Sequence, residues 1–228
     1  MLQLVGCGDD SSDGAVAPTS ESCARVPEEI EGPFAGDGSN GPNVLDQTGV
    51  VRNDIRSSFA GLVGTADGVR MVIELALVSA VTCDPLRNRA VYVWHCDRLG
   101  RYSLYSAGVS NQNYLRGVQS TEANGKVRFT SIFPACYAGR WPHIHFEVFQ
   151  SVGSATNASN KRSTSQIALP KAACDLVYAT PGYEQSATNL GQVTLASDSV
   201  FREGSSLQLA TVTGTVAMGL TVMLTAAV

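Results

Sequence analysis

The stretch His143-Ile144-His145-Phe146-Glu147-Val148 alternates polar and apolar side chains with a period of two residues. Successive side chains of a β-strand point to opposite faces, so this alternation predicts a strand with His143, His145 and Glu147 on one face and an apolar stripe on the other. Two imidazoles on the same face of a strand are expected to enter one volume, where they can bind a single metal ion. The alternative is that each histidine fills core space with satisfied hydrogen bonds.

Similar short runs of apolar and often β-branched residues recur along the rest of the chain, and Gly-rich turns separate them. No long segment with the periodicity of a helix accompanies these runs. The pattern is typical of a two-sheet β-sandwich, and 228 residues with 44% hydrophobic composition suffice for one substantial core. We therefore predict an all-β fold, a two-sheet β-sandwich, with strands over residues 71–78, 90–95, 126–132, 143–149, 207–212 and 216–225.

Two tyrosines, Tyr102 and Tyr137, precede the histidine pair and bear on the choice of metal. Tyr137 follows Pro134, which ends the run 126–132 and turns the chain, so its side chain can lean over the next strand. A phenol has a pKa of about 10 and ionises at neutral pH only beside a strong Lewis acid. Zinc sites recruit Cys, His and carboxylates, and ferrous oxygenases use two histidines with one carboxylate, so paired phenols favour ferric iron. The alternative for either tyrosine alone is a half-buried position in the sandwich.

Short motifs around these residues recur together in a characteristic order and spacing. They are Glu31-Gly32-Pro33-Phe34, Arg52-Asn53-Asp54-Ile55, Cys83-Asp84-Pro85-Leu86, Val93-Trp94-His95-Cys96-Asp97, Gly100-Arg101-Tyr102-Ser103, Tyr114-Leu115-Arg116-Gly117, Gly139-Arg140 and His143-Ile144-His145-Phe146. With these motifs, the chain from Glu31 to about Val228 resembles the intradiol ring-cleavage dioxygenases. This family of non-haem ferric enzymes includes catechol 1,2-dioxygenase and protocatechuate 3,4-dioxygenase.

The resemblance implies a two-sheet sandwich that carries Fe(III) at one edge. The iron would be held by Tyr102, Tyr137, His143 and His145, with water or hydroxide completing the shell. Arg140 matches the arginine that opposes negative charge on the substrate. Gln166 matches a glutamine of the family that lies beside the centre.

The resemblance also implies the substrates, which are a catechol-type aromatic compound and O2. The ring would open between its two hydroxyls to give a muconate-type product, and Tyr137 would accept a substrate proton. Pocket walls are expected from residues 32–34, 105–115 and Trp141. Phe34 stands where relatives often have tyrosine, so the particular catechol stays open. The third histidine, His95, is expected on a strand beside the site without binding the metal.

Two other functions share parts of this pattern. A β-sandwich tethered to the cell envelope could bind a partner after losing catalysis, but it would have no chemical reason to keep two phenols, two imidazoles and Arg140 together. Extradiol cleavage or hydroxylation typically relies on ferrous iron with a carboxylate ligand, which the tyrosines do not match.

Residues 1–26 differ in composition from the single catalytic domain predicted over 27–228. The stretch from Gly8 to about Glu21 is rich in Gly, Ser, Asp, Ala and Pro, and it is expected to be a flexible tether. Before it, Leu4-Val5-Gly6-Cys7 resembles a bacterial lipoprotein processing site, although the basic and apolar segments that normally precede such a site are missing. We therefore predict an exported protein with a lipid anchor at Cys7. The alternative is a plain tail on a cytoplasmic enzyme.

Composition argues against several partners. The net charge is −4 and the basic residues are scattered, which argues against nucleic acid. No apolar run reaches about 18 residues, so no membrane span is expected. The sequence contains no Cys-x-x-Cys motif, so neither a zinc site nor a thioredoxin-like site is expected. Disulfides would fit an exported protein, and their pairing stays open, as does the oligomeric state.

Overall fold

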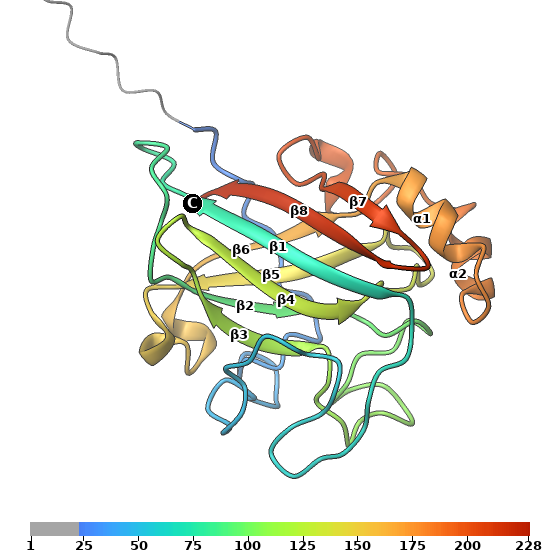
Figure 1. Cartoon of the computed structure of the whole chain (residues 1–228), viewed down its shortest axis with the longest axis horizontal. Coiled ribbons are helices and arrows are strands. Elements are labelled where there is room, and N and C mark those ends of the chain that lie inside the picture. The colour runs from blue at the N-terminus through green and yellow to red at the C-terminus, as the bar shows by residue number, and fades with distance from the viewer. Residues whose placement is uncertain (1–22) are drawn as a thin grey trace, which may run out of the picture.

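The computed structural model describes residues 23–228, which form two four-stranded β-sheets packed face to face (Figure 1). The first sheet has the strand order β4-β1-β8-β7, and the second has the order β3-β2-β5-β6. The strands are β1 (Arg70–Val78), β2 (Ala90–Trp94), β3 (Arg116–Ser120), β4 (Lys126–Ile132), β5 (His143–Phe149), β6 (Lys161–Ala168), β7 (Thr211–Thr215) and β8 (Gly219–Ala227). The predicted all-β, two-sheet β-sandwich is therefore confirmed.

Several elements are absent from the sequence prediction. Strand β3 has only five residues, and β6 consists mostly of polar residues that are nonetheless buried, so neither shows an apolar alternation. Packing against neighbouring strands, more than intrinsic propensity, makes such segments strands. Two helices, α1 (Lys171–Tyr178) and α2 (Glu184–Leu190), span about two turns each, which is too short for a periodic pattern to stand out.

The strand predicted over residues 207–212 is wrong, because β7 begins only at Thr211. The residues before it cross to the second sheet, where Leu209 forms an isolated bridge with Ala168. Gln208 is buried there and its amide donates to Glu29. The strand predicted from 216 starts at Gly219, since residues 216–218 form the turn between β7 and β8.

The main core lies between the two sheets. Strand β1 alternates buried and partly exposed residues, with Met71, Ile73 and Leu75 fully buried. These side chains belong to one cluster with Ile144 and Phe146 of β5. The apolar stripe of β5 thus faces the core between the sheets, and the histidines of β5 lie on the outer face of the second sheet.

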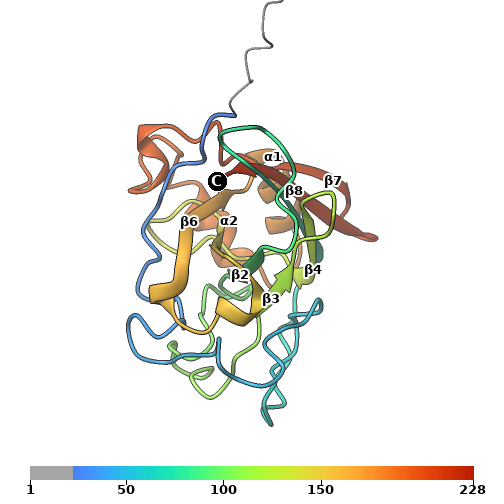
Figure 2. The same ribbon diagram turned by 90° about the vertical axis from the view of Figure 1, so that its left-hand side faces the viewer.

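That outer face is covered as well, so all seven residues of β5 are buried. The N-terminal segment runs beside β6 (Figure 2), where the Glu29 amide donates to the carbonyl of Thr164 and the carbonyl of Ile30 accepts from the side chain of Gln166. The covering segment removes the two histidines from solvent.

The register of β2, β5 and β6 sets two rows of side chains on this covered face. Directly paired residues of antiparallel strands share a face. The His145 row consists of Trp94, His145 and Gln166, and the Glu147 row, one pair further along, consists of Tyr92, Glu147 and Thr164.

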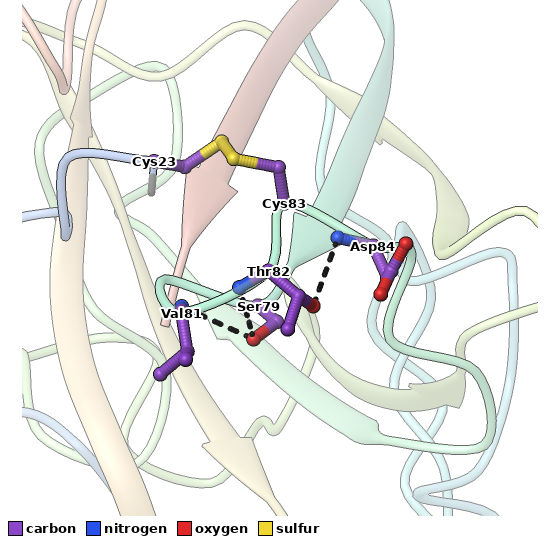
Figure 3. Close-up of a disulfide and its surroundings, with 6 residues drawn as sticks. All are labelled: Cys23, Ser79, Val81, Thr82, Cys83 and Asp84. Carbon is purple, nitrogen blue, oxygen red and sulfur yellow. Dashed lines mark hydrogen bonds between the residues drawn. A yellow bond between two sulfur atoms is a disulfide. The ribbon is translucent and has the colours of Figure 1, made fainter. Parts of the chain in front are cut away.

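A disulfide between Cys23 and Cys83 fastens the start of the described chain to the loop after β1 (Figure 3). Just beyond it, Val26 is 1% exposed and belongs to the core. The chain is therefore attached to the sandwich a few residues before position 27, where the catalytic domain is predicted to begin. The predicted tether at residues 8–21 and the predicted anchor at Cys7 lie outside the described residues. Within residues 23–228, no helix combines the length and hydrophobicity needed to cross a bilayer.

Candidate metal centre

Strand β5 positions the two histidines at its first and third residues. The Nε2 atoms of His143 and His145 lie 3.1 Å apart, and both side chains are buried. The ring of Trp94, from the neighbouring strand, stacks on His145 with 4.7 Å between ring centroids and 6° between planes. The indole therefore fixes the plane of that imidazole.

Tyr102 reaches the histidines from the loop after β2. The carboxylate of Asp97 accepts hydrogen bonds from the backbone amides of Leu99 and Arg101, which closes a tight turn. Gly100 in this turn has a φ of 78°, in the left-handed region that favours glycine. A Cβ at Gly100 would also lie 3.0 Å from the Cβ of Tyr137, so the turn packs directly against the second tyrosine.

Tyr137 follows β4 in a segment without regular structure, just before the turn at residues 138–139. Its hydroxyl lies 3.3 Å from Nε2 of His143. The Tyr102 hydroxyl lies 3.4 Å from Nε2 of each histidine. Tyr102 is 1% exposed, whereas Tyr137 is only partly buried.

Four of the six separations among the donor atoms can be compared with those expected around one metal ion. Ligands about 2.0–2.1 Å from one ion lie about 2.9–3.4 Å from each other in octahedral or tetrahedral arrangements. The observed separations of 3.1–3.4 Å fall within that range. The Nδ1 of His143 lies 2.5 Å from the carbonyl oxygen of Trp141, which can only accept, so Nδ1 carries the proton and Nε2 presents a lone pair.

Burial controls the charge of these groups. It lowers the pKa of His143 to about 3 and that of His145 well below its usual value, with the positive charge of Arg140 acting in the same direction. Both imidazoles are therefore neutral, as metal ligation requires. Burial also raises the pKa of Tyr137 to about 12 and that of Tyr102 well above 10. These phenols can ionise only beside a strongly charged cation.

Arg140 is held beside the four donors by two partners. Its Nη2 donates to Oε1 of Gln166 over 2.7 Å, and its Nε donates to Oδ2 of Asp198 over 2.9 Å. The Gln166 amide in turn donates to the carbonyl of Ile30. Asp198 is fully buried and also accepts from the backbone amide of Trp141 over 2.7 Å.

The structure thus brings together all six residues singled out from the sequence: Tyr102, Tyr137, Arg140, His143, His145 and Gln166. Sequence reasoning did not find Asp198 or the stacking role of Trp94. A motif did contain Trp94, but Asp198 lies 58 residues from Arg140, so no local pattern connects the two.

Three other residues named from the sequence lie apart from the four donors. His95 is buried with Nδ1 at 2.8 Å from the carbonyl of Cys96 and Nε2 at 2.7 Å from the hydroxyl of Ser131. Trp141, expected in a pocket wall, is buried in the main core and donates to the carbonyl of Leu169. It serves the site through its backbone. The hydroxyl of Tyr105 donates to Asn40 and accepts from the amide of Gly36.

Comparison with known proteins agrees with the fold. A sequence model of a family described as Dioxygenase matches residues 40–180. Among curated protein sequences, none matches the chain. An intradiol ring-cleavage dioxygenase from Tetranychus urticae shares the fold with a TM-score of 0.70 at 24% sequence identity, over 90% of this chain and 94% of that one.

Two bacterial enzymes share the fold less closely. Hydroxyquinol 1,2-dioxygenase from Pseudomonas putida DLL-E4 gives a TM-score of 0.55 at 15% identity, over 91% of this chain and 67% of that one. Catechol 1,2-dioxygenase from Pseudomonas arvilla C-1 gives 0.54 at 20% identity, over 88% of this chain and 61% of that one. With a family match over more than half of its length, the chain belongs to the intradiol ring-cleavage dioxygenase family.

Proposed function

We propose that this protein is a non-haem Fe(III) dioxygenase that opens a catechol-type ring between its two hydroxyls with O2 and gives a muconate-type product. The observation that carries the proposal is the convergence of two phenol oxygens and two imidazole Nε2 atoms, whose measured separations are 3.1–3.4 Å. Tyr102, Tyr137, His143 and His145 would hold the iron. Bound ferric iron would supply a Lewis acid that takes up both catechol oxygens and makes the ring reactive towards O2.

The two tyrosines would have different roles because their surroundings differ. The Tyr102 hydroxyl lies between both imidazoles and is buried, so it is suited to stay in place. Tyr137 is partly exposed, and its hydroxyl contacts His143 and the Tyr102 hydroxyl. Its oxygen would be the one that yields to the incoming catechol and accepts a proton from it. A phenolate already next to the substrate is an effective base for that step.

Arg140 would stabilise the negative charge that develops on the substrate during ring opening. Its guanidinium is anchored through Nε and Nη2 by Asp198 and Gln166, so it requires little reorganisation. A fixed positive charge in a largely water-free site is worth more than one in bulk solvent. Asp198 and Gln166 are positioning residues in this scheme.

Phe34 would form part of the substrate pocket. Its ring stacks on Tyr102 with 4.8 Å between centroids and lies 5.4 Å from the ring of Tyr105. Phe34 offers an apolar surface without a hydroxyl, which favours a substrate whose aromatic face lies in that direction. Plain, hydroxylated and chlorinated catechols and protocatechuate are the substrates to compare.

The experiment is to load the purified chain with iron, supply catechols and O2, and identify the product. A muconate supports the proposal. A semialdehyde would mean extradiol cleavage, and failure of every catechol in the panel would favour a binding protein without catalysis. Tyrosinate-to-Fe(III) charge transfer should give the protein a visible colour that Tyr102→Phe removes. Tyr105→Phe is the matched control, because that tyrosine lies nearby and contacts none of the four donors; it should keep the colour.

We also propose that the protein is exported and, through Cys7, anchored to the bacterial cell envelope by lipid. The disulfide between Cys23 and Cys83 supports export, because disulfides persist in oxidising compartments and are rare in the cytoplasm. Fractionation of cells with metabolic labelling by a fatty acid tests both parts. Label in the wild type that is lost in Cys7→Ser is expected, and an unlabelled protein in the cytoplasmic fraction would refute the proposal.

A further inference from the structure

Three acidic side chains meet on the covered outer face of the second sheet, one residue pair beyond the His145 row. They are Glu31, Asp37 and Glu147, and one carboxylate oxygen from each lies within 4.8 Å of the others. Asp37 and Glu147 are fully buried, and the Glu31 side chain is 30% exposed. Carboxylates without cations are ordinarily found in water, so this burial needs a physical explanation.

Several oxygen atoms around this cluster have unused hydrogen-bonding capacity. Within residues 23–228, Asp37 Oδ2 and Glu147 Oε2 have no partner outside the cluster, although the Glu147 side chain contacts those of Asp37 and Thr164. The same holds for Oγ1 of Thr164, which is 4% exposed and sits directly opposite Glu147 in the register. A buried polar atom without a partner destabilises the fold, and native proteins usually satisfy it with water or an ion. These atoms therefore point to a missing ligand.

Charge indicates what that ligand is. Lys161 is the one basic side chain with a measured contact to the cluster within the described chain: it bonds Glu31 and lies 3.3 Å from Oε1 of Glu147. From outside the cluster, and within the described residues, the Asp37 carboxylate accepts hydrogen bonds from the amide and the hydroxyl of Ser39, both at Oδ1. Burial and the adjacent Asp37 raise the pKa of Glu147 to about 9, so Glu147 holds a proton when no cation is bound, and a cation binding there would displace that proton. With all three carboxylates ionised, the cluster and the ammonium of Lys161 carry a formal charge of −2. A divalent cation would neutralise it, and two adjacent buried carboxylates otherwise repel each other.

We propose that Glu31, Asp37, Glu147 and the hydroxyl of Thr164 form a binding site for a hard divalent cation, and that Ca²⁺ fits it best. All the donors are oxygen atoms, which suits Ca²⁺ and Mg²⁺ and disfavours softer metals. Mg²⁺ usually keeps several waters and uses one or two carboxylates, whereas Ca²⁺ accepts many protein oxygens in irregular geometry. A surface cleft opens beside two of these donors, and its lining includes Glu31, Lys161 and Thr164.

This site is separate from the tyrosine–histidine centre but shares its supports. Glu147 follows His145 by two residues on the same face of β5. The segment between Glu31 and Asp37 packs against the tyrosine–histidine centre. A Cβ at Gly32 would lie 3.7 Å from Cε1 of His145, and the Phe34 ring stacks on Tyr102. A cation held by Glu31, Asp37 and Glu147 would therefore fasten the segment that covers the metal centre.

The test is calorimetric titration of the purified full chain with CaCl2 at constant ionic strength, together with thermal melting. We expect binding at one site and a melting temperature that rises with Ca²⁺ concentration, as mass action requires. Asp37→Asn should weaken binding at least about tenfold, because a charged ligand is lost. Asp46→Asn removes an exposed aspartate and is the matched control, which should bind as the wild type does. Equal affinity in Asp37→Asn and the wild type would overturn the proposal.

A second variant keeps the test decisive if Asp37→Asn does not fold. Lys161→Met removes the cation that competes for Glu31 and Glu147, so it should bind Ca²⁺ more tightly than the wild type and recover stability when Ca²⁺ is added. If neither the wild type nor Lys161→Met responds to Ca²⁺, the carboxyls instead share a proton and the proposal is wrong.

Discussion

Replacing Asp198 with asparagine tests how firmly the structure anchors Arg140. The Asp198 carboxylate is fully buried and accepts four hydrogen bonds: Oδ2 from Arg140 Nε and the Trp141 amide, and Oδ1 from the amides of Val200 and Phe201. Asparagine has nearly the same shape, but one of its two terminal atoms becomes a donor. Two of the four donors would then face an NH2 group, and Arg140 would lose its buried counterion.

The expected loss of stability follows from that count. Hydrogen bonds to charged groups contribute about 1.5–3 kcal/mol each, and removing one partner of a buried ion pair costs about 3–5 kcal/mol. We therefore expect Asp198→Asn to lower the free energy of unfolding by about 3–5 kcal/mol. At a urea m-value of about 2.5 kcal/mol/M, the unfolding midpoint would fall by about 1–2 M.

Urea denaturation followed by circular dichroism measures this shift. Asp175→Asn is the control, because Asp175 forms an exposed ion pair with Lys171 at i, i+4 spacing, with side chains 52% and 63% exposed. Such a pair contributes at most about 0.5 kcal/mol, so this midpoint should hardly move. A loss below about 1 kcal/mol in Asp198→Asn would refute the reasoning. In turnover with a catechol, the same variant should lower kcat more than it raises KM, since Arg140 acts on charge that develops during the reaction.

Three further predictions follow from the described contacts. Burial alone would raise the pKa of Asp198, but hydrogen bonds from Trp141 and Arg140 outweigh it and hold this pKa below its usual value. The carboxylate therefore contributes its full stability above the pKa of the unfolded state. That stability is lost as the pH falls through the pKa of the folded state. The stability gap between wild type and Asp198→Asn should accordingly narrow below about pH 4 in denaturation curves, and a constant gap would contradict this. Gly100→Ala should lower the free energy of unfolding by about 1–2 kcal/mol, because the backbone there is left-handed. It should also weaken the visible iron band, because the added Cβ would meet Tyr137. An unchanged spectrum would count against this packing. Replacing both Cys23 and Cys83 with serine should lower the free energy of unfolding by up to about 4 kcal/mol for a separation of 60 residues, and equal melting of oxidised and reduced protein would show that the bond contributes nothing.

Local patterns carried most of what the sequence predicted correctly. The alternation in β5 assigns the correct faces, because side-chain direction in a strand depends only on neighbouring residues. The same alternation could not show that the histidine face is buried, since that depends on the N-terminal segment and β6, which pack there from far along the chain. Strand β6 is polar because its side chains bond the N-terminal segment, so composition alone hides it.

The residues of the site also fall into those that sequence motifs reveal and those that only the fold brings together. The family resemblance collected residues from four separate segments that the fold then brings together, including Gln166, which pairs with His145 across the sheet. Asp198 contacts Arg140 only because the chain after α2 returns to the end of the sandwich. Position in a fold, and not any property of the local sequence, gives that aspartate its role. The cluster of Glu31, Asp37 and Glu147 has the same origin.

The antiparallel pairing of β1 and β4 separates the two ends of the molecule. Arg70 at the start of β1 pairs with Ile132 at the end of β4, so Tyr137 lies near the start of β1. Cys83, and with it Cys23, follows the other end of this nine-residue strand, roughly 30 Å away. An affinity tag or a solid support joined just before Cys23 would therefore attach at the opposite end of the sandwich from Tyr137. Immobilising the chain in that orientation should leave the tyrosine–histidine centre open to dissolved aromatic compounds.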